Sequence, residues 1–146
     1  MIVFDTDVVS FVMRAAPPAA LVRRIAAIPP AEQATTSITV GELVFGACRS
    51  TRPDHYLSAL RDFVFPCFRV LPFETEAATI CGRLRADLER RRCPVGEPDL
   101  RIAAICLHNG AELATGNVRR FERIEGLRVT DWLADFRPPP PPGGRP

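Results

Sequence analysis

Short apolar runs alternate with helical stretches along most of this chain, and that alternation restricts the possible folds more than any other feature. Apolar or β-branched runs predict strands at 1–4, 34–38, 68–71, 111–115 and 127–130. Helical spacing predicts helices at 19–28, 39–48, 54–65, 75–92 and 98–109, with shorter pieces after the first strand and at 118–123. Because strands that alternate with helices form parallel sheets covered on both faces, we predict a three-layer α/β/α fold with a central, mainly parallel sheet.

The length of 146 residues is typical of one domain. We expect residues 1–136 to form that domain and the Pro- and Gly-rich residues 137–146 to form a disordered tail. No run approaches the roughly 20 apolar residues that cross a bilayer, and the N-terminus does not have the pattern of a signal peptide. The five cysteines form no CxxC pair, which argues against a zinc ribbon. We therefore expect a cytoplasmic protein without a membrane partner.

Four oxygen-bearing side chains fall where predicted strands end or predicted helices begin. They are Asp5, Glu42, Asp99 and Asn117. In a parallel sheet the carboxyl ends of the strands share one edge, where ligands bind, so we expect these side chains to converge. Oxygen ligands suit magnesium or manganese better than zinc.

Each of these residues also has a purely structural explanation. Thr39 and Glu42 have the spacing of a capping box, with Thr39 as the N-cap and Glu42 in the first turn of the helix. Asp99 would favour the positive end of its helix dipole, and Asn117 follows a glycine as an ordinary turn residue. Asp5 is harder to explain in this way, because a carboxylate that ends an apolar strand is expected to be partly buried, and the sequence offers no obvious partner for it.

The chain contains no lysine, so all 19 of its basic residues are arginine. The planar guanidinium group suits phosphate, although genomic base composition can produce the same bias. Arg119, Arg120 and Arg123 follow Asn117 closely, where they could clamp phosphates or simply form a solvated charged face. The sequence leaves both explanations open.

Four segments carry a resemblance to a known family. In order along the chain, residues 2–7, 39–43, 96–104 and 115–121 resemble the motifs of the PIN-domain ribonucleases and, within them, the VapC toxins of bacterial toxin–antitoxin pairs. The resemblance implies that Asp5, Glu42 and Asp99 hold Mg²⁺, with Mn²⁺ as a substitute, and that Asn117 completes the catalytic set for hydrolysis of RNA phosphodiester bonds. Relatives often carry aspartate at the fourth position, so Asn117 weakens the charge of the site and predicts one firmly held ion at rest.

The same resemblance implies further roles and partners. Thr115, Arg119 and Arg120 are expected to bind substrate, and Asp7 or Glu97 could supply the missing negative charge. The implied partners are an RNA substrate, a cognate antitoxin protein that blocks the acidic groove, and a second copy of the chain. The homodimer would form through the apolar faces of the helices that precede the third strand.

The sequence leaves two alternatives to a ribonuclease toxin. The first is a PIN-like domain that has lost catalysis and serves as an RNA- or protein-binding module, which Asn117 favours. The second is a haloacid-dehalogenase-type phosphatase, because Asp5 and Asp7 after an apolar strand resemble the first motif of those enzymes. The late acids Asp131 and Asp135 do not have the context that such a phosphatase requires.

Overall fold

The computed structural model describes residues 1–137 and contains one sheet of five strands. The strands are β1 (Ile2–Phe4), β2 (Gln33–Thr36), β3 (Arg69–Leu71), β4 (Glu112–Thr115) and β5 (Arg128–Asp131). Their order in the sheet is β3-β2-β1-β4-β5, and every neighbouring pair is parallel. The predicted α/β fold is therefore confirmed, with a sheet that is wholly parallel among the described residues.

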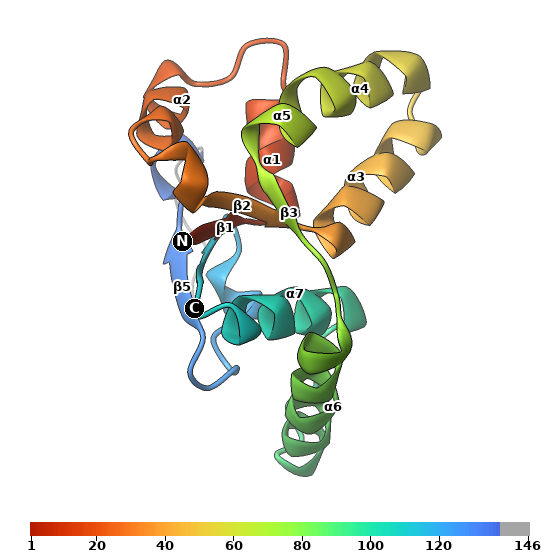
Figure 1. Cartoon of the computed structure of the whole chain (residues 1–146), viewed down its shortest axis with the longest axis vertical. Helices are drawn as coiled ribbons and strands as arrows, with labels where there is room; N and C mark the ends of the chain where they lie inside the picture. The colour runs from red at the N-terminus through yellow and green to blue at the C-terminus, as the bar shows by residue number, and fades with distance from the viewer. Residues whose placement is uncertain (138–146) are drawn as a thin grey trace, which may run out of the picture.

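Helices cover both faces of this sheet (Figure 1). One side carries α1 (Thr6–Val12), α2 (Ala19–Ala26), α3 (Ser37–Arg49), α4 (Pro53–Ala59), the π-helical turn η2 (Leu60–Val64) and α5 (Phe65–Cys67). The other side carries α6 (Thr75–Arg90) and α7 (Glu97–His108). Short 3₁₀ turns complete the described chain: η1 (Pro30–Glu32), η3 (Val118–Arg120) and η4 (Ala134–Phe136).

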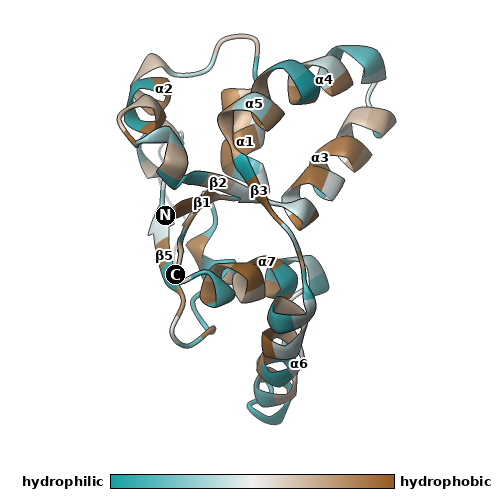
Figure 2. Ribbon diagram, in the orientation of Figure 1, coloured by the Kyte–Doolittle hydropathy of each residue, from teal (hydrophilic) through white to brown (hydrophobic). Residues whose placement is uncertain are grey.

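Alternating side chains of the central strand divide the core in two. Val3 packs among the residues of α6 and α7, whereas Phe4 packs on the opposite face with α1, α2 and η2. Both side chains are completely buried, as expected for a strand covered on both sides. Figure 2 shows apolar residues concentrated around the sheet, in β1 and α1, while the far end of α6 is hydrophilic. Among the described residues, no helix has the length and apolar character needed to cross a membrane.

The junction between β2 and α3 differs from the prediction. The strand ends at Thr36, and the Thr36 hydroxyl accepts a hydrogen bond from the Thr39 backbone N–H at 3.0 Å, so Thr36 is the N-cap and α3 begins at Ser37. The prediction of Thr39 as N-cap was wrong, because two threonines three residues apart offer the same capping geometry and the local sequence does not distinguish them. Glu42 consequently lies in the second turn of α3, where it is too far along the helix to complete a capping box.

The C-terminal end of the described chain packs back onto the fold. Arg137 pairs with Asp131 at 2.9 Å, and its guanidinium also donates to the carbonyl oxygen of Gly116. The remainder of the predicted tail, residues 138–146, lies outside the described part of the chain.

Candidate active site

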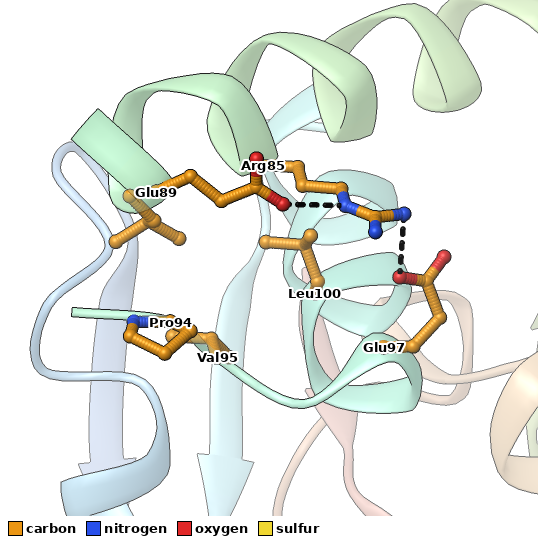
Figure 3. Close-up of a pocket in the computed structure, with 7 residues that line it drawn as sticks. Arg85, Glu89, Pro94, Val95, Glu97 and Leu100 are labelled. Atoms are coloured by element: carbon orange, nitrogen blue, oxygen red, sulfur yellow. Dashed lines mark hydrogen bonds and ion pairs between the residues drawn. The ribbon is translucent and has the colours of Figure 1, made fainter. Parts of the chain in front are cut away.

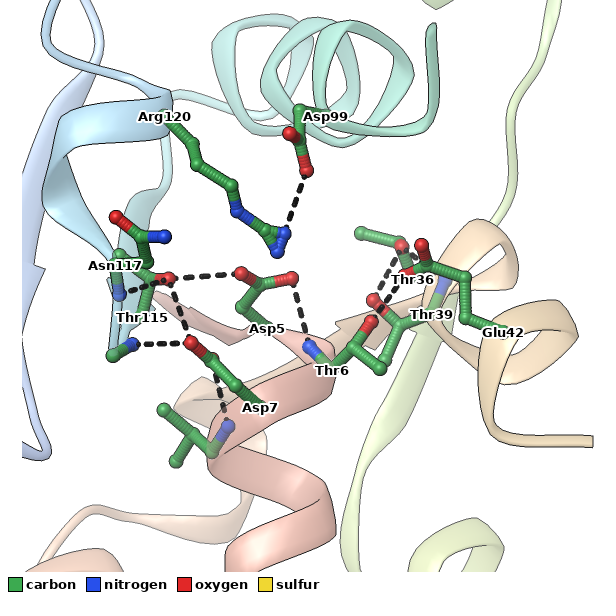
Figure 4. A network of polar contacts seen from close by, with 12 residues as sticks. Asp5, Thr6, Asp7, Thr36, Thr39, Glu42, Asp99, Thr115, Asn117 and Arg120 are labelled. Atoms are coloured by element: carbon green, nitrogen blue, oxygen red, sulfur yellow. Dashed lines mark hydrogen bonds and ion pairs between the residues drawn. The ribbon is translucent and has the colours of Figure 1, made fainter. Parts of the chain in front are cut away.

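The carboxyl ends of β1 and β4 bring the predicted residues to one place (Figure 4). Asp5 lies between β1 and α1, Thr115 ends β4, and Asn117 begins η3. Asp99 in the first turn of α7 and Glu42 on α3 face the same region from the two sides of the sheet. The predicted convergence of Asp5, Glu42, Asp99 and Asn117 at one edge is therefore what the structure contains.

Asp5 is the most deeply buried of the four, with no exposed surface. Its Oδ1 accepts a hydrogen bond from the Thr6 backbone N–H at 2.7 Å, and its Oδ2 accepts one from the Thr115 hydroxyl at 2.8 Å. Burial and the nearby charge of Asp7 raise the pKa of Asp5 to about 6, against the opposing effects of the two hydrogen bonds and of Arg120. At neutral pH this buried group is therefore mostly an anion, and both of its direct partners are neutral donors.

Asp99 is the second carboxylate of the cluster, and its side chain is only 15% exposed. Burial raises its pKa, Arg120 opposes that effect, and the charges of Glu42 and Asp7 add to it. The Arg120 guanidinium donates to Asp99 Oδ1 at 3.1 Å. Asp5, Asp99 and Glu42 thus lie near one another, and the pKa values of Asp5 and Asp99 are raised. Such a concentration of negative charge favours a cation.

Glu42 accepts a hydrogen bond from the Thr6 hydroxyl, which joins α3 to the start of α1. Sequence reasoning did not identify Thr6 as a site residue, and no local pattern around it would have revealed this contact. Beyond Glu42 lies a pocket of about 450 Å³ between α1, α3 and α4, whose polar lining includes Arg14, Arg52 and His55. The acidic cluster thus continues into a groove on the α1–α4 side of the sheet.

Asp7 holds the turn that follows β4 in place. Its Oδ2 accepts the Gly116 backbone N–H at 2.9 Å, and its Oδ1 accepts the Val8 backbone N–H at 2.8 Å. The turn is closely packed, because a Cβ on Gly116 would lie 2.6 Å from Leu133 Cδ1 and 2.8 Å from Asp7 Oδ2, and these side chains would have to move. Asp7 therefore contributes charge near the site but uses both oxygens on backbone amides, and its main role is to position Thr115 and Asn117.

Glu97 does not join the cluster. It pairs with Arg101 at 3.0 Å and lies 3.6 Å from Arg85, beside a separate pocket between α6 and α7 (Figure 3). The expectation that Glu97 supplies charge to the acidic site was wrong, because it is the first residue of α7 and points to a different face from Asp99.

The three arginines after Asn117 have different surroundings. Arg120 points into the acidic cluster, as Figure 4 shows. Arg119 is exposed, and within residues 1–137 no hydrogen bond joins it to the carboxylates. Arg123 lies beside the end of α6, where its carbonyl oxygen accepts from Arg91. The phosphate-binding interpretation therefore remains a prediction for Arg119 and Arg120, whereas Arg123 faces another part of the surface.

The donor set fits a hard divalent cation. Carboxylate, hydroxyl and amide oxygens surround the buried Asp5, which suits Mg²⁺ or Mn²⁺. Within the part of the chain that the structure describes, however, no three His, Cys, Asp or Glu side chains already stand in an arrangement that could hold an ion. Asp99 faces Arg120 instead, so the carboxylates must adjust before they share a metal.

Comparisons with known proteins agree with this geometry. Residues 2–127 match the PIN domain family. The chain is 36% identical over 128 residues to the tRNA(fMet)-specific endonuclease VapC of Shigella flexneri, covering 88% of this chain and 95% of that protein. It is 31% identical over 129 residues to ribonuclease VapC2 of Haemophilus influenzae, covering 88% and 96%.

Solved structures show the same similarity in three dimensions. DNA-bound VapBC from Salmonella typhimurium superposes with a TM-score of 0.82 at 34% identity, covering 90% of this chain and 97% of that one. VapBC-1 from nontypeable Haemophilus influenzae gives a TM-score of 0.80 at 28% identity, covering 90% and 98%. The similarity extends over nearly the whole described chain in both cases.

Proposed function

We propose, from the premise that this chain belongs to the VapC ribonucleases of the PIN-domain family, that Asp5, Glu42 and Asp99 hold a divalent metal ion for RNA hydrolysis. Mg²⁺ is the proposed ion and Mn²⁺ its substitute. The phosphatase alternative is not supported, because the family is a different one and Asp131 is engaged by Arg137 and by the Leu133 backbone N–H.

One observation carries this proposal: Asp5 is fully buried and has two hydrogen-bond donors, but neither donor is charged. A neutral residue could cap the helix without the free-energy cost of ionising a buried carboxylate that has no charged hydrogen-bond partner. Capping alone therefore does not explain Asp5. Asp99 adds a second poorly solvated carboxylate on the facing helix. This accumulation of negative charge in a buried place is what a bound cation would offset.

The chain's own residues prepare the reaction. Thr115 and the Thr6 N–H fix both oxygens of Asp5, and the Thr6 hydroxyl orients Glu42. Asn117 presents a neutral amide at the same edge, so the site has three acids and an amide. When bound, a divalent ion lowers the pKa of a water molecule and stabilises the charge of the phosphodiester displacement. Arg119 and Arg120 are proposed to bind the phosphates of the RNA.

The proposed biological setting is a toxin–antitoxin pair. Solved relatives are VapBC complexes, and we propose that a cognate antitoxin covers the acidic groove of this chain. A transfer RNA is the first substrate to test, because two relatives are named as tRNA(fMet)-specific endonucleases.

We also propose a homodimer formed by the α2 and η2–α5 face. Three apolar side chains there are more than a third exposed, namely Val22, Phe63 and Phe65. Light scattering of the purified toxin tests this part: Phe63→Ser with Phe65→Ser should yield a monomer, and a monomeric wild type would contradict it.

The function is tested by RNA cleavage with the full chain freed from any antitoxin. We expect cleavage of tRNA with Mg²⁺ or Mn²⁺, none with EDTA, and none with Asp5→Asn under conditions where its circular dichroism is unchanged. Asp87→Asn, a surface carboxylate on α6, is the matched control and should cleave as wild type does. Absence of cleavage by a folded wild-type chain would favour the alternative of a binding module without catalysis.

A further inference from the structure

Among residues 1–137, Arg120 is the basic side chain that points into the acidic cluster, and it comes from η3, which follows Asn117 directly. Its Nη1 lies 3.1 Å from Asp99 Oδ1, and its guanidinium lies between Asp99 and Asp5 (Figure 4). Its charge acts on both carboxylates, since it opposes the raised pKa of each. Arg120 thus places a positive charge between the buried carboxylate of Asp5 and the partly exposed carboxylate of Asp99.

The position of Arg120 is not that of an ordinary surface ion pair. Its side chain is 35% exposed, yet its Nε is buried without a hydrogen-bond partner among the described residues. A buried donor without a partner costs free energy, so a purely structural arginine would be expected to satisfy it. The guanidinium therefore reaches Asp99 with only part of its hydrogen-bonding capacity used.

Three observations together indicate that Arg120 and a divalent cation compete for Asp99. The donor set suits a divalent cation, the described acids are not arranged to share one, and the nearest cation to Asp99 is the chain's own arginine. The guanidinium uses a lone pair of Asp99 Oδ1, and its positive charge at this distance repels a divalent ion that approaches the same carboxylate.

We infer that Arg120 is an internal counter-ion that occupies the cation position of the metal-free site, and that a divalent ion must displace it from Asp99. This inference rests on the proposed function, because it assumes that Asp5 and Asp99 are metal ligands. The displaced guanidinium remains on η3 at the edge of the same pocket, where it retains its full donor capacity for an RNA phosphate.

Metal affinity without substrate tests the inference, with Mn²⁺ as the probe and its free concentration followed by electron paramagnetic resonance. Arg120→Met keeps most of the aliphatic stem and removes the competing charge, so we expect Mn²⁺ to bind roughly three- to tenfold more tightly than to wild type. Arg120→Lys keeps a positive charge without the planar guanidinium, so its Mn²⁺ affinity should lie between those of wild type and Arg120→Met. Arg119→Met, the exposed neighbour, is the matched control and should bind as wild type does.

Thermal unfolding supplies a second readout that separates displacement from a merely structural ion pair. Displacement predicts that Arg120→Met lowers the Tm of the metal-free protein but not that of the Mn²⁺-saturated protein. A structural ion pair would lower both by the same amount. Mn²⁺ binding by Arg120→Met that is equal to or weaker than that of wild type would overturn the inference and leave the proposed function intact. Failure of wild type and all variants to bind Mn²⁺ would instead contradict the proposed function.

Discussion

The Thr115 hydroxyl donates a 2.8 Å hydrogen bond to Asp5 Oδ2, joining two residues that are 110 positions apart in the chain. This contact ties the end of β4 to the end of β1 and fixes the buried carboxylate at the centre of the site. The same hydroxyl accepts the Asn117 backbone N–H at 3.1 Å, so one side chain organises both the acid and the turn beside it.

Replacing Thr115 should therefore affect Asp5 directly. Thr115→Val keeps the shape of the side chain but removes the donor, and loss of this bond should destabilise the fold by about 1–2 kcal/mol in urea unfolding. Because the hydroxyl lowers the pKa of Asp5, the acid limb of the cleavage–pH profile should also move to higher pH. Thr115→Ser retains the donor and serves as the control. An unchanged profile for Thr115→Val would show that the hydroxyl does not tune Asp5.

Stability of the metal-free protein should depend on pH through Asp5. Its folded-state pKa of about 6 lies above the ordinary value of 3.8, so the native chain binds more protons than the unfolded chain between these values. Ionisation of Asp5 in the folded state therefore costs stability as pH rises through this window, by on the order of 2–3 kcal/mol in total. Urea unfolding with EDTA at pH 4 to 8 measures the effect.

Asp5→Asn is the comparison for that experiment, because it lacks the titrating carboxyl. Subtracting its free energy of unfolding from that of wild type cancels the contributions of the other acids. The stability difference between wild type and Asp5→Asn should change across pH 4 to 6, in favour of wild type at the acidic end. A difference that stays constant with pH would mean that the pKa of Asp5 is ordinary.

The turn after β4 should tolerate no side chain at Gly116. In Gly116→Ala the new Cβ would lie 2.6 Å from Leu133 Cδ1 and 2.8 Å from Asp7 Oδ2, so these side chains must shift, and a shift of Asp7 breaks its hydrogen bond to the backbone N–H of the turn that precedes Asn117. We expect cleavage to fall at least tenfold, with a loss of about 1–3 kcal/mol of stability from overpacking. Gly82→Ala is the control: it lies inside α6 with open space around it, and it should stabilise the protein by about 0.5–1 kcal/mol. Wild-type cleavage by Gly116→Ala would contradict the positioning role of the turn.

Asn117→Asp should strengthen the metal site. It adds a fourth carboxylate at an exposed position beside Asp5, and extra ligand charge raises cation affinity, here by about tenfold for Mn²⁺. Calorimetric titration of the variant against wild type and Asn117→Ala measures this. If Asn117→Asp binds Mn²⁺ no better than Asn117→Ala does, the side chain at this position does not face the ion.

Much of this architecture is predictable from the sequence, because it depends on local patterns. The apolar run that ends at Asp5 identifies β1, and the parallel alternation of elements places Asp5, Asp99 and Asn117 at one edge before any coordinates are known. The strand order could not be predicted, since each strand has only three or four residues and such a short segment does not specify its neighbours in the sheet.

The parts of the site that could not be predicted depend on the directions in which side chains point in the folded protein. Arg119 and Arg120 are indistinguishable in the sequence, and only the rotation of η3 directs Arg120 toward Asp99. Asp7 was expected only as a source of negative charge, and the fold directs both of its oxygens toward backbone N–H groups, which the sequence does not indicate. The contact between Glu42 and Thr6 joins residues 36 positions apart, so it depends on how α3 packs beside α1 and not on the sequence around either residue.

The most direct test of the account is the position of Mn²⁺ in crystals of the antitoxin-free chain, located by anomalous scattering. We predict a peak within coordination distance of both the Asp5 and Asp99 carboxylates, with Arg120 no longer bonded to Asp99. Well-ordered crystals in saturating Mn²⁺ that show no peak between these two carboxylates, and Arg120 still bonded to Asp99, would contradict the central claim that this buried acidic cluster is a metal site.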